Sequence, residues 1–487
     1  MLVDLQLNRV LVAGAGVSGA GCAAALVDLG VDVIIADNNL AAATQLADEL
    51  ASHHTQADTA DARENSMPRV TAVAATEVDF VAKSEFSALD LVVTSPGWPP
   101  HAPLLIAAQN AGLEVIGDVE LGYRLDRSEI YGPKRDWLVI TGTNGKTTTT
   151  GMLASILEAH GKRVGKRSLA TGNIGASVFA ALAATPRVDI VVLEASSFQL
   201  HWAPSLTPDV GVLLNIADDH IDWHGSFAAY AADKAAVLRA PKRVVGIDDA
   251  EAKLVVSEKG LSSREFTQYP PQPGQVGVVN GNLVVAGVAA RESIELARTE
   301  GLQPPGAAGI LDAGAAAAAA YDYGVHPSDI AAGLARYRVA AHRGAVVASI
   351  GGVDYIDNSK ATNPHAAQAA MAGLASIVWV AGGQLKGASV AELVRAEAHR
   401  IKAAVLVGVD KHIIAETLRE QAPEIPVEII DSVEPRECMQ LAVAAAHRLA
   451  TAGDTVLLAP AAASLDMFSG MAQRGDLFAR ATSDYSG

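Results

Sequence analysis

The sequence predicts an α/β protein in which parallel sheets are covered by helices. Apolar, strand-like runs alternate with helix-compatible segments along the chain, and two of these runs lead directly into glycine-rich turns. The 487 residues also exceed what one hydrophobic core normally supports. We therefore expect three domains, which span residues 1–130, 131–339 and 340–487.

Composition excludes several classes of protein. Half of the residues are apolar, but no uninterrupted apolar run reaches the roughly 18 residues needed to cross a bilayer. The formal net charge of −17 argues against nucleic acid as a partner, because binding to a phosphate backbone needs clustered Lys and Arg. Cys22 and Cys438 signal neither a disulfide framework nor a zinc site. The first residues lack the pattern of a secretory signal, so we expect a cytoplasmic protein without membrane insertion. We also expect a monomer.

The first domain begins with a strand over Arg9–Ala13, an alanine-rich helix that ends near Gly30, and a second strand over Val31–Asp37. The polar stretch from Ser52 to Arg69 is predicted to be a loop. A third strand, Leu89–Thr94, stops at a turn with the sequence Ser-Pro-Gly-Trp-Pro-Pro.

The turn Gly14-Ala-Gly-Val-Ser-Gly19 follows the first strand, and Asp37 ends the next strand about twenty residues further on. This pattern fits a dinucleotide fingerprint. Its glycines let a phosphate approach the backbone, while the acidic residue can accept hydrogen bonds from ribose hydroxyls. The same turn can hold any nucleotide diphosphate, such as a UDP-sugar, or can serve only tight packing of a helix on a strand.

A second glycine-rich turn, Thr141-Gly-Thr-Asn-Gly-Lys-Thr-Thr-Thr149, follows the strand Trp137–Ile140 and opens a helix. Its backbone N–H groups and the helix N-terminus can converge on phosphate oxygens, with a mobile cation from the lysine. The glycines are three residues apart instead of five, so this is a shorter variant of the P-loop. The alternative is an ordinary turn with a solvated lysine. The candidate nucleotide-binding residues are Gly142, Thr143, Asn144, Gly145, Lys146, Thr147 and Thr148, of which either of the last two can hold Mg²⁺ through its hydroxyl.

Two further strands are predicted in the central domain. The strand Val188–Leu193 leads into Glu194, and the strand Pro208–Leu214 leads into a segment that contains His220. Ligands gather at the carboxyl ends of strands in open α/β sheets, so both side chains are expected near the phosphate loop, where they could bind Mg²⁺ or Mn²⁺. The alternative is a solvated acidic cap. Lys234 lies on an amphipathic helix and, from the residues alone, is a surface lysine.

The later part of the central domain includes a predicted hairpin over Val276–Val285, because Asn280-Gly281 favours a tight turn. The third domain shows strands at 376–381, 403–407 and 455–458. Basic and hydroxyl residues that follow or flank these strands could close over phosphates or line the same cleft, and each could equally be a solvated loop residue. They are Arg343, Lys360, Lys386 and Ser464.

Taken together, the motifs resemble those of the Mur ligase family over nearly the whole chain. The order is specific, and the resemblance is greatest to the D-glutamate-adding member, although the phosphate loop alone would also fit sister ligases or folylpolyglutamate synthases. The motifs are Gly-x-Gly-x-x-Gly, Ser-Pro-Gly, the short phosphate loop, Gly172-Asn-Ile-Gly175, Glu-x-Ser-Ser-Phe-Gln-Leu, Asp-His-x-Asp, His-Arg, Asn-Ser-Lys-Ala-Thr-Asn and Ser-Leu-Asp-x-Phe.

The resemblance implies Rossmann-like N-terminal and C-terminal domains around a central P-loop ATPase-like domain. It also implies a reaction, in which ATP drives the addition of D-glutamate to UDP-N-acetylmuramoyl-L-alanine through an acyl phosphate, during peptidoglycan precursor synthesis. The residues expected at the UDP-sugar are Val17, Ser18, Asp37, Ser95 and Gly97, and those expected at its acyl end are Asn173, Ser196 and Gln199.

The remaining site residues also follow from the resemblance. The family carries a carbamylated lysine at the position of Lys234, so the expected ligands of Mg²⁺ or Mn²⁺ are Thr147, Glu194, His220 and Lys234; the last three, with Lys146, are the expected catalytic residues. ATP would contact Asp312, Arg343, Asn358 and Lys360, and D-glutamate would contact Thr362, Lys386 and Ser464. Three positions depart from the family pattern: Asp312 replaces an asparagine, Asp357-Asn358 inverts the usual order, and Met471 replaces a phenylalanine.

Three other functions compete with this one. A nicotinamide-dependent oxidoreductase would use the first glycine-rich turn but would leave the phosphate loop, Glu194 and His220 unexplained. A nucleotide-sensing scaffold would bind ATP without chemistry. A related ligase could add L-alanine or a diamino acid.

Overall fold

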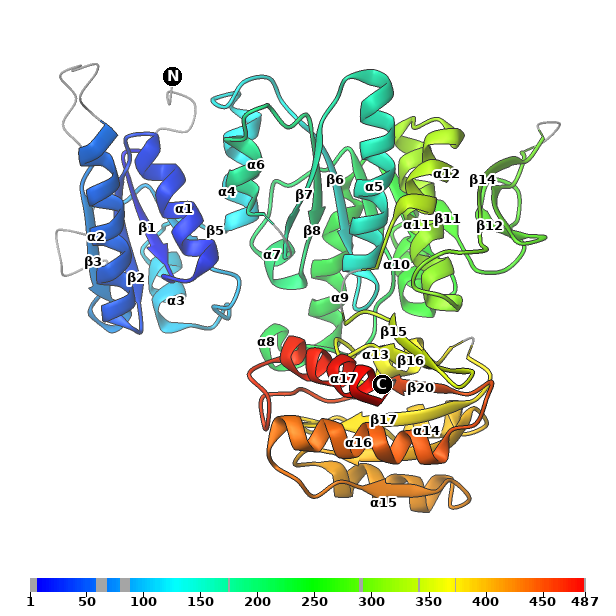
Figure 1. The fold of residues 1–487 in the computed structure, drawn as a ribbon. Coiled ribbons are helices and arrows are strands. Elements are labelled where there is room, and N and C mark those ends of the chain that lie inside the picture. The colour runs from blue at the N-terminus through cyan, green and yellow to red at the C-terminus, as the bar shows by residue number, and fades with distance from the viewer. Residues whose placement is uncertain are drawn as a thin grey trace. The chain divides into compact units, whose positions relative to one another are not determined.

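The computed structural model describes residues 7–57, 68–78, 88–173, 176–288, 292–339, 342–372 and 374–485 (Figure 1). The chain forms two compact units. Unit 1 comprises Met1–Glu265 and Ala317–Ile330, and unit 2 comprises Phe266–Ala316 and Ala331–Gly487. The predicted α/β class is confirmed, whereas the three domain boundaries stay predictions. Within the described ranges, no helix is both long and apolar enough to span a bilayer.

The N-terminal sheet of unit 1 has the strand order β3-β2-β1-β4-β5, and every pair is parallel. This is the order of a Rossmann-like half. Helix α2 continues to Ala57, so the loop predicted from Ser52 is helical at its start; residues 58–67 lie outside the described ranges. The bounds are β1 Arg9–Ala13, α1 Val17–Asp28, β2 Asp32–Asp37, α2 Leu40–Ala57, β3 Val70–Ala74, β4 Leu91–Thr94, α3 Pro103–Asn110, β5 Val115–Gly117 and α4 Asp118–Arg127.

Strand β1 shows why this sheet is covered on both faces. Val10 and Val12 share a core with Leu26 of α1 and residues of α4, whereas Leu11 packs in a separate core with Leu105 of α3. Successive side chains of a strand point to opposite faces, so a strand that is buried on both faces reads as a continuous apolar run. The sequence Arg-Val-Leu-Val-Ala has this property.

The second sheet of unit 1 places β6 between β9 and β8, in the order β10-β9-β6-β8-β7 with all pairs parallel. The carboxyl ends of β8 and β9 therefore flank the loop that follows β6. The bounds are β6 Asp136–Thr141, α5 Lys146–Val164, β7 Ser168–Gly172, α6 Val178–Leu182, β8 Ile190–Glu194, α7 Ser197–His201, β9 Val210–Leu213, α8 Ile221–His224, α9 Phe227–Ala235, β10 Lys242–Gly246 and α10 Ala250–Glu258.

In unit 2, β13 pairs antiparallel with β12 and β14, and the predicted hairpin is confirmed: β12 and β13 flank Asn280 and Gly281, whose φ angles are 49° and 75°. Positive φ at both positions is the requirement of a type I′ turn. Helices α11 and α12 have residues in both units. The bounds are β11 Arg264–Phe266, β12 Val276–Val279, β13 Asn282–Val285, β14 Ile294–Arg298, α11 Ala307–Tyr323 and α12 Pro327–Arg336.

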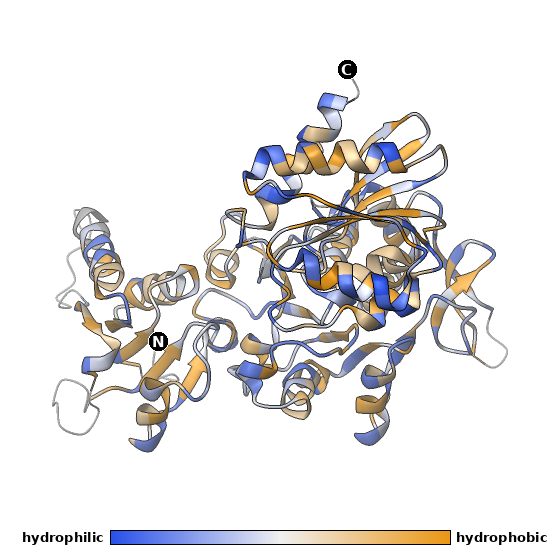
Figure 2. Ribbon diagram, turned by 90° about the horizontal axis from the view of Figure 1, so that it is seen from below, coloured by the Kyte–Doolittle hydropathy of each residue, from blue (hydrophilic) through white to orange (hydrophobic). Residues whose placement is uncertain are grey.

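The C-terminal sheet of unit 2 has the order β15-β16-β20-β17-β18-β19, in which β15 alone pairs antiparallel. Helices α16 and α17 pack on one face, and α13, α14 and α15 pack on the other. Figure 2 shows that the strands are mostly hydrophobic, whereas the helices mix hydrophobic and hydrophilic residues. The bounds are β15 Ala345–Ile350, β16 Val353–Asp357, α13 Pro364–Met371, β17 Ile377–Gly382, α14 Ala391–Glu397, β18 Ile401–Val407, α15 Lys411–Gln421, β19 Val427–Ile429, α16 Pro435–Leu449, β20 Thr455–Leu458 and α17 Met471–Tyr485.

Candidate functional site

The predicted phosphate loop joins β6 to the N-terminus of α5. Gly145 caps α5 with φ 81°, a conformation that favours glycine, and a Cβ on Gly142 would come within 2.8 Å of the Leu214 Cβ. In the described part of the chain, no side chain caps this helix. The positive end of α5 is therefore available to an anion.

Residues of the segment that follows β9, together with Tyr230 of α9, hold the loop in shape. The Asn215 side chain accepts a hydrogen bond from Asn144 N at 2.8 Å and donates one to Asn144 O at 3.2 Å. The Thr143 hydroxyl lies 2.8 Å from the Tyr230 hydroxyl and accepts a bond from Ala217 N at 2.9 Å. Asn215 and Tyr230 were not predicted from the sequence, although they lie in the segments that contain the predicted site residues His220 and Lys234. The one available signal was an asparagine at the end of a strand that adjoins the loop.

Two lysines converge on one carbonyl of this loop. Lys146 Nζ donates to Gly142 O and Thr143 O, both at 2.9 Å, and Lys234 Nζ donates to Gly142 O at 2.7 Å. Lys234 is only 2% exposed, so its interpretation as a surface lysine is wrong. Burial, followed by the charge of Lys146, lowers the pKa of Lys234 well below its usual value. The loop therefore lies beside a buried amine that is easily deprotonated.

Glu194 ends β8, where it pairs with Ile140 of β6, and is 1% exposed. Its Oε1 accepts a hydrogen bond from Asn173 Nδ2 at 3.0 Å, while its buried Oε2 has no hydrogen-bond partner among the described residues. An unsatisfied buried carboxylate oxygen is costly unless a ligand completes it. Asn173 is the second residue of the Gly172-Asn-Ile-Gly175 motif, whose residues 174–175 lie outside the described ranges.

His220 precedes α8 with φ 52°, a left-handed conformation that is uncommon outside glycine. Burial lowers the pKa of His220; the charges of Lys234 and Lys146 also lower this pKa, and Asp219 opposes them. These interactions place the imidazole near both lysines. The neutral ring can donate a lone pair to a metal ion.

These groups fit a hard divalent cation. Glu194 offers a free carboxylate oxygen, His220 a neutral imidazole, and Thr147 a buried hydroxyl in the first turn of α5. Among the described residues no three of His, Cys, Asp and Glu form a metal-binding group. The remaining ligands would have to be hydroxyl, water, phosphate or a modified Lys234.

The first glycine-rich turn is shaped by two of the predicted UDP-sugar residues. Asp37 accepts hydrogen bonds from Ala15 N at 2.7 Å and Asn39 N at 2.8 Å, so both of its oxygens have backbone partners. A Cβ on Gly14, whose φ is 108°, would lie 2.5 Å from the Ser95 hydroxyl oxygen. This hydroxyl is buried and has no hydrogen-bond partner within the described ranges.

Two further predicted UDP-sugar residues lie beside open space. Val17, the first residue of α1, is 88% exposed, and in the described part of the chain no side chain caps this helix. A Cβ on Gly97, in the turn after β4, would meet nothing within 4 Å. An exposed apolar side chain at an uncapped helix start leaves room for a ligand with a phosphate.

Asp118, which sequence reasoning missed, joins the predicted UDP-sugar and acyl-end residues. It accepts a hydrogen bond from Gln199 Nε2 at 3.3 Å and another from Ser18, and burial raises its pKa against these bonds. Gln199 Oε1 in turn accepts from Ser196 N at 3.1 Å, within the box that caps α7. The predicted residues Ser18, Ser196 and Gln199 therefore belong to one hydrogen-bonded set.

In unit 2, the predicted residues follow three neighbouring strands. Asn358, Lys360 and Thr362 follow β16, Ser464 follows β20, and Lys386, with φ 53°, follows β17. Parallel strands place these loops at one edge of the sheet.

The buried guanidinium of Arg474, another residue missed by sequence reasoning, ties these three loops together. It donates to Ser359 Oγ at 3.0 Å, Ser359 O at 2.9 Å, and Gly382 O and Ala462 O at 3.2 Å each. Burial lowers its pKa to about 10. The planar fork of arginine suits several acceptors at fixed angles.

The predicted ATP residues Arg343 and Asp312 occupy other parts of unit 2. Arg343 follows His342, whose Nδ1 lies 2.6 Å from Asp357 Oδ2 and whose carbonyl accepts a bond from Lys360 N at 3.0 Å. Asp312 lies near the start of α11 and is buried. Their roles, like those of all the predicted site residues, stay predictions.

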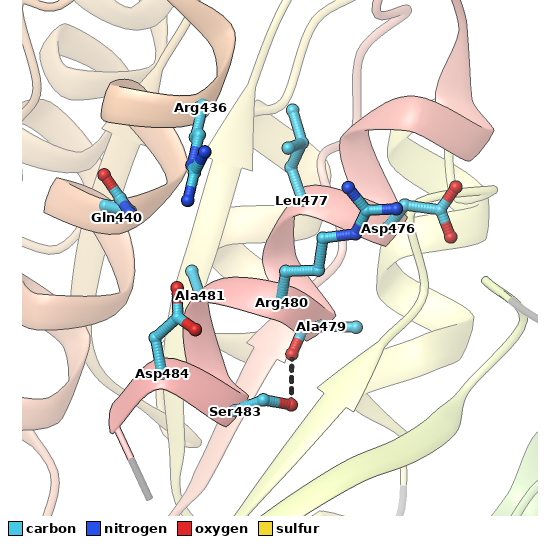
Figure 3. Close-up of a pocket in the computed structure, with 9 residues that line it drawn as sticks. All are labelled: Arg436, Gln440, Asp476, Leu477, Ala479, Arg480, Ala481, Ser483 and Asp484. Carbon is cyan, nitrogen blue, oxygen red and sulfur yellow. Dashed lines mark hydrogen bonds between the residues drawn. The ribbon is translucent and has the colours of Figure 1, made fainter. Parts of the chain in front are cut away.

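A surface pocket lies between α16 and α17 (Figure 3). Arg436 and Gln440 of α16 face Asp476, Arg480 and Asp484 of α17 across it. No residue predicted from the sequence lines this pocket.

Comparison with known families agrees with the motif order. Residues 140–271 match the Mur ligase middle domain, and residues 342–462 match the Mur ligase glutamate ligase domain. Residues 3–110 match the C-terminal domain of alanine dehydrogenase/PNT proteins, as expected of a Rossmann-like fold.

Curated relatives align over nearly their whole length. A protein of Corynebacterium diphtheriae is 50% identical over 100% of this chain and 98% of its own length. A protein of Corynebacterium efficiens is 49% identical over 99% of this chain and 95% of its own length. A protein of Mycolicibacterium smegmatis is 45% identical over 97% of this chain and 96% of its own length. All three carry the name UDP-N-acetylmuramoylalanine--D-glutamate ligase.

Solved structures share the fold. The UDP-N-acetylmuramate-alanine ligase of Thermotoga maritima superposes with a TM-score of 0.55 at 14% identity, over 99% of this chain and 100% of its own. The FolC protein of E. coli, in complex with DHPP and ADP, gives a TM-score of 0.51 at 19% identity, over 76% of this chain and 93% of its own. The full-length relatives and the two family matches show that the chain belongs to the Mur ligase family.

Proposed function

We propose that the chain is an ATP-dependent amide ligase that adds D-glutamate to UDP-N-acetylmuramoyl-L-alanine in the cytoplasm, as a step of peptidoglycan precursor synthesis. The observation that carries the proposal is the phosphate loop with Lys146 and Lys234 on one carbonyl, beside the unsatisfied oxygen of Glu194. The names of the full-length relatives support the choice of D-glutamate.

The N-terminal turn binds the UDP-sugar in this proposal. The uncapped start of α1 receives the diphosphate, and the Ser95 hydroxyl, which is buried without a partner in the described part of the chain, donates to the ligand. Ser18, held by Asp118, and Gln199, held by Asp118 and Ser196, fix the direction from the nucleotide end to the acyl end. The alternative of a nicotinamide cofactor leaves the second phosphate loop without a role.

The chemistry begins with phosphoryl transfer. An amine does not condense with a carboxylate in water because the leaving group is poor, so the γ-phosphoryl group of ATP passes to the substrate carboxylate and ADP leaves. Lys146 leaves its loop carbonyls and neutralises charge on the transferred group. The D-glutamate amine then attacks the acyl carbon, loses a proton and expels phosphate, which leaves an amide.

The proposed cation sites use Glu194, His220, Thr147 and Lys234. A bound Mg²⁺ would supply charge neutralisation at the phosphates. The low pKa of Lys234 keeps a fraction of its amine neutral, the form that reacts with carbon dioxide to give a carbamate, which would turn the side chain into an oxygen ligand. Asn173 holds Glu194 in place through Oε1 and leaves Oε2 for the ion.

Residues of unit 2 bind the other two reactants in the proposal. Arg343, Asn358 and Lys360 bind ATP, with Asp312 near the adenine, and Thr362, Lys386 and Ser464 position D-glutamate. The shared hydrogen bonds of Arg474 support a common role for these loops. Correct placement of reactants can supply roughly 7–11 kcal/mol of a reaction barrier.

A screen of amino acids tests the proposal. Purified protein with ATP, Mg²⁺ and UDP-N-acetylmuramoyl-L-alanine should release ADP when D-glutamate is added, and much less with L-alanine, L-glutamate or a diamino acid. ADP release that follows another amino acid would reassign the substrate. A change in NADH absorbance without ADP release would indicate the oxidoreductase, and ATP binding without any release would indicate the scaffold.

A further inference from the structure

One carboxylate beside the proposed metal site is held by two imidazoles. Asp233 Oδ2 lies 2.8 Å from His224 Nδ1 and 2.9 Å from His201 Nδ1. His224 also reaches the Ser197 hydroxyl, at 2.9 Å from its Nε2. The order of the contacts is therefore Ser197, His224, Asp233 and His201.

The chemistry of these groups fixes which atoms donate. Asp233 contacts both rings through its carboxylate, which accepts hydrogen bonds, so each Nδ1 carries a hydrogen atom. When Nδ1 carries the one hydrogen atom of the ring, Nε2 of His224 is the acceptor and the Ser197 hydroxyl donates to it. His224 thus makes two directional bonds, one on each side of its ring.

The network connects the elements that carry the proposed metal ligands. Ser197 begins α7, three residues after Glu194, and His224 ends α8, which His220 precedes. Asp233 stands directly before Lys234 in α9. A bond between His224 and Asp233 therefore fixes α8 against α9, and the bond to Ser197 fixes α8 against α7.

The surroundings of His224 make both bonds necessary. Its side chain is 0% exposed and packs against the rings of Phe198, at 5.5 Å, and Tyr230, at 5.2 Å. A buried polar ring without hydrogen bonds is costly, so the ring keeps a single orientation only while both partners are present. His201 differs, because its side chain is 31% exposed.

We propose that His224 is a positioning residue for the metal site. Through Asp233 it sets α9, and with it Lys234, relative to His220 of α8, so that both side chains reach one divalent cation. His224 itself touches neither the ion nor a substrate. This inference rests on the proposed function, because it assumes that Lys234 and His220 serve a cation.

Three substitutions of His224 separate its two bonds. His224→Asn places an amide donor where Nδ1 stands and keeps the bond to Asp233, whereas His224→Gln reaches the position of Nε2 and keeps only the bond to Ser197. His224→Phe keeps the ring and loses both bonds. Mn²⁺ alone is titrated into each full-length variant, and the free ion is followed by electron paramagnetic resonance.

We expect His224→Gln and His224→Phe to weaken Mn²⁺ binding by about 10-fold or more, the range seen when partners of metal ligands are removed. His224→Asn should restore the affinity to within about threefold of the unsubstituted protein. In steady-state kinetics, the first two variants should lower kcat and raise the Mg²⁺ concentration for half-maximal rate, with the KM for the UDP-sugar changed less than about twofold. A fold-wide defect would lower kcat without moving the Mg²⁺ requirement.

His201→Phe is the matched control, because it removes the other imidazole from the same carboxylate oxygen. It should leave Mn²⁺ affinity within about twofold, since the hydrogen bond that it removes joins His201 to α9, while a phenylalanine ring can keep the ring contacts of His201 with Trp223 and His224 of α8. Unchanged Mn²⁺ binding in a folded His224→Phe variant overturns the inference, as does an equal loss in His201→Phe. If the unsubstituted protein binds Mn²⁺ but releases no ADP with D-glutamate, the proposed function fails while the positioning result still stands on its own.

Discussion

Replacing Lys234 with methionine should abolish ligase activity and at the same time stabilise the fold. Methionine fills the space of the lysine side chain without its amine. The amine is buried, and its polar partner in the described part of the chain is the Gly142 carbonyl, not a carboxylate. This environment suits a reactive group and disfavours a charged one.

The size of the stabilisation follows from the pKa and the lost bond. Each unit by which burial lowers the pKa of Lys234 costs about 1.4 kcal/mol of folding free energy at neutral pH. The lost hydrogen bond costs roughly 1 kcal/mol, and the Gly142 carbonyl keeps Lys146 as a donor at 2.9 Å. Because the pKa lies well below its usual value, the free energy of unfolding should rise by about 1 kcal/mol or more.

The pH dependence has a defined sign. The unfolded chain holds the proton of Lys234 more tightly than the folded chain, so the stability of the unsubstituted protein rises with pH between the folded and unfolded pKa values. The extra stability of the Lys234→Met variant over the unsubstituted protein should therefore shrink as the pH approaches about 10. Denaturant unfolding at a series of pH values, without metal ions or bicarbonate, measures the difference.

A second variant tests the chemical role. Lys234→Ala leaves a cavity, so a small carboxylic acid such as acetate should partly restore ADP release, whereas the methionine side chain leaves no room for it. Full activity in either unrescued variant would refute the metal-ligand role. A Lys234→Met variant that is less stable by more than about 1 kcal/mol at neutral pH would refute the argument from burial.

Three other perturbations test separate parts of the structure. Lys146→Ala should remove ATP turnover while UDP-substrate affinity in calorimetry stays within about twofold; lost UDP binding with intact turnover would reverse the assignment of the two glycine-rich turns. Arg474→Lys should raise the KM values for ATP and D-glutamate by about tenfold, because a point charge cannot serve the loops after β16, β17 and β20 together; an equal rise for the UDP-sugar would contradict this. Burial opposes ionisation of Asp454, but hydrogen bonds from Lys402, Ser376 and Thr451 together outweigh it and lower its pKa to about 2; Lys402→Met removes one of these bonds and should cost about 1 kcal/mol at neutral pH, discounted for the exposure of Lys402. This depressed pKa stabilises the fold above about pH 4, so the difference in Tm should shrink as the pH falls below about 4 and vanish only below about 2.

The sheets could be predicted because their strands are buried on both faces. Apolar runs such as Trp137–Ile140 stand out in the sequence and end in glycine-rich turns. The strand ends in the structure differ from the predicted ends by a few residues: β8 begins at Ile190, two residues after the predicted start, and includes Glu194. The edge strand β15 was missed, because it is only partly buried and its pattern is weak.

Side chains that hold other residues were harder to predict than side chains that could meet a ligand. Lys146 and Glu194 carry recognisable chemistry at fixed places after strands. Asn215, Asp118 and Arg474 act through contacts between segments far apart in the chain, and no local spacing signals such contacts. The burial of Lys234 is of the same kind, because its helix looks amphipathic until the packing of Tyr230 beside it is known.

The hydrogen bonds of Asn215 and Tyr230 keep the phosphate loop ordered, and this affects the thermodynamics of nucleotide binding. A loop that is already ordered does not need to fold around a nucleotide, so ADP binding should show a small heat-capacity change. For the same reason, closure of the loop should not limit the rate at which ADP associates. Nucleotide mimics that match the existing shape of the backbone should therefore lose little affinity to induced ordering, and stiff analogues should bind as well as flexible ones.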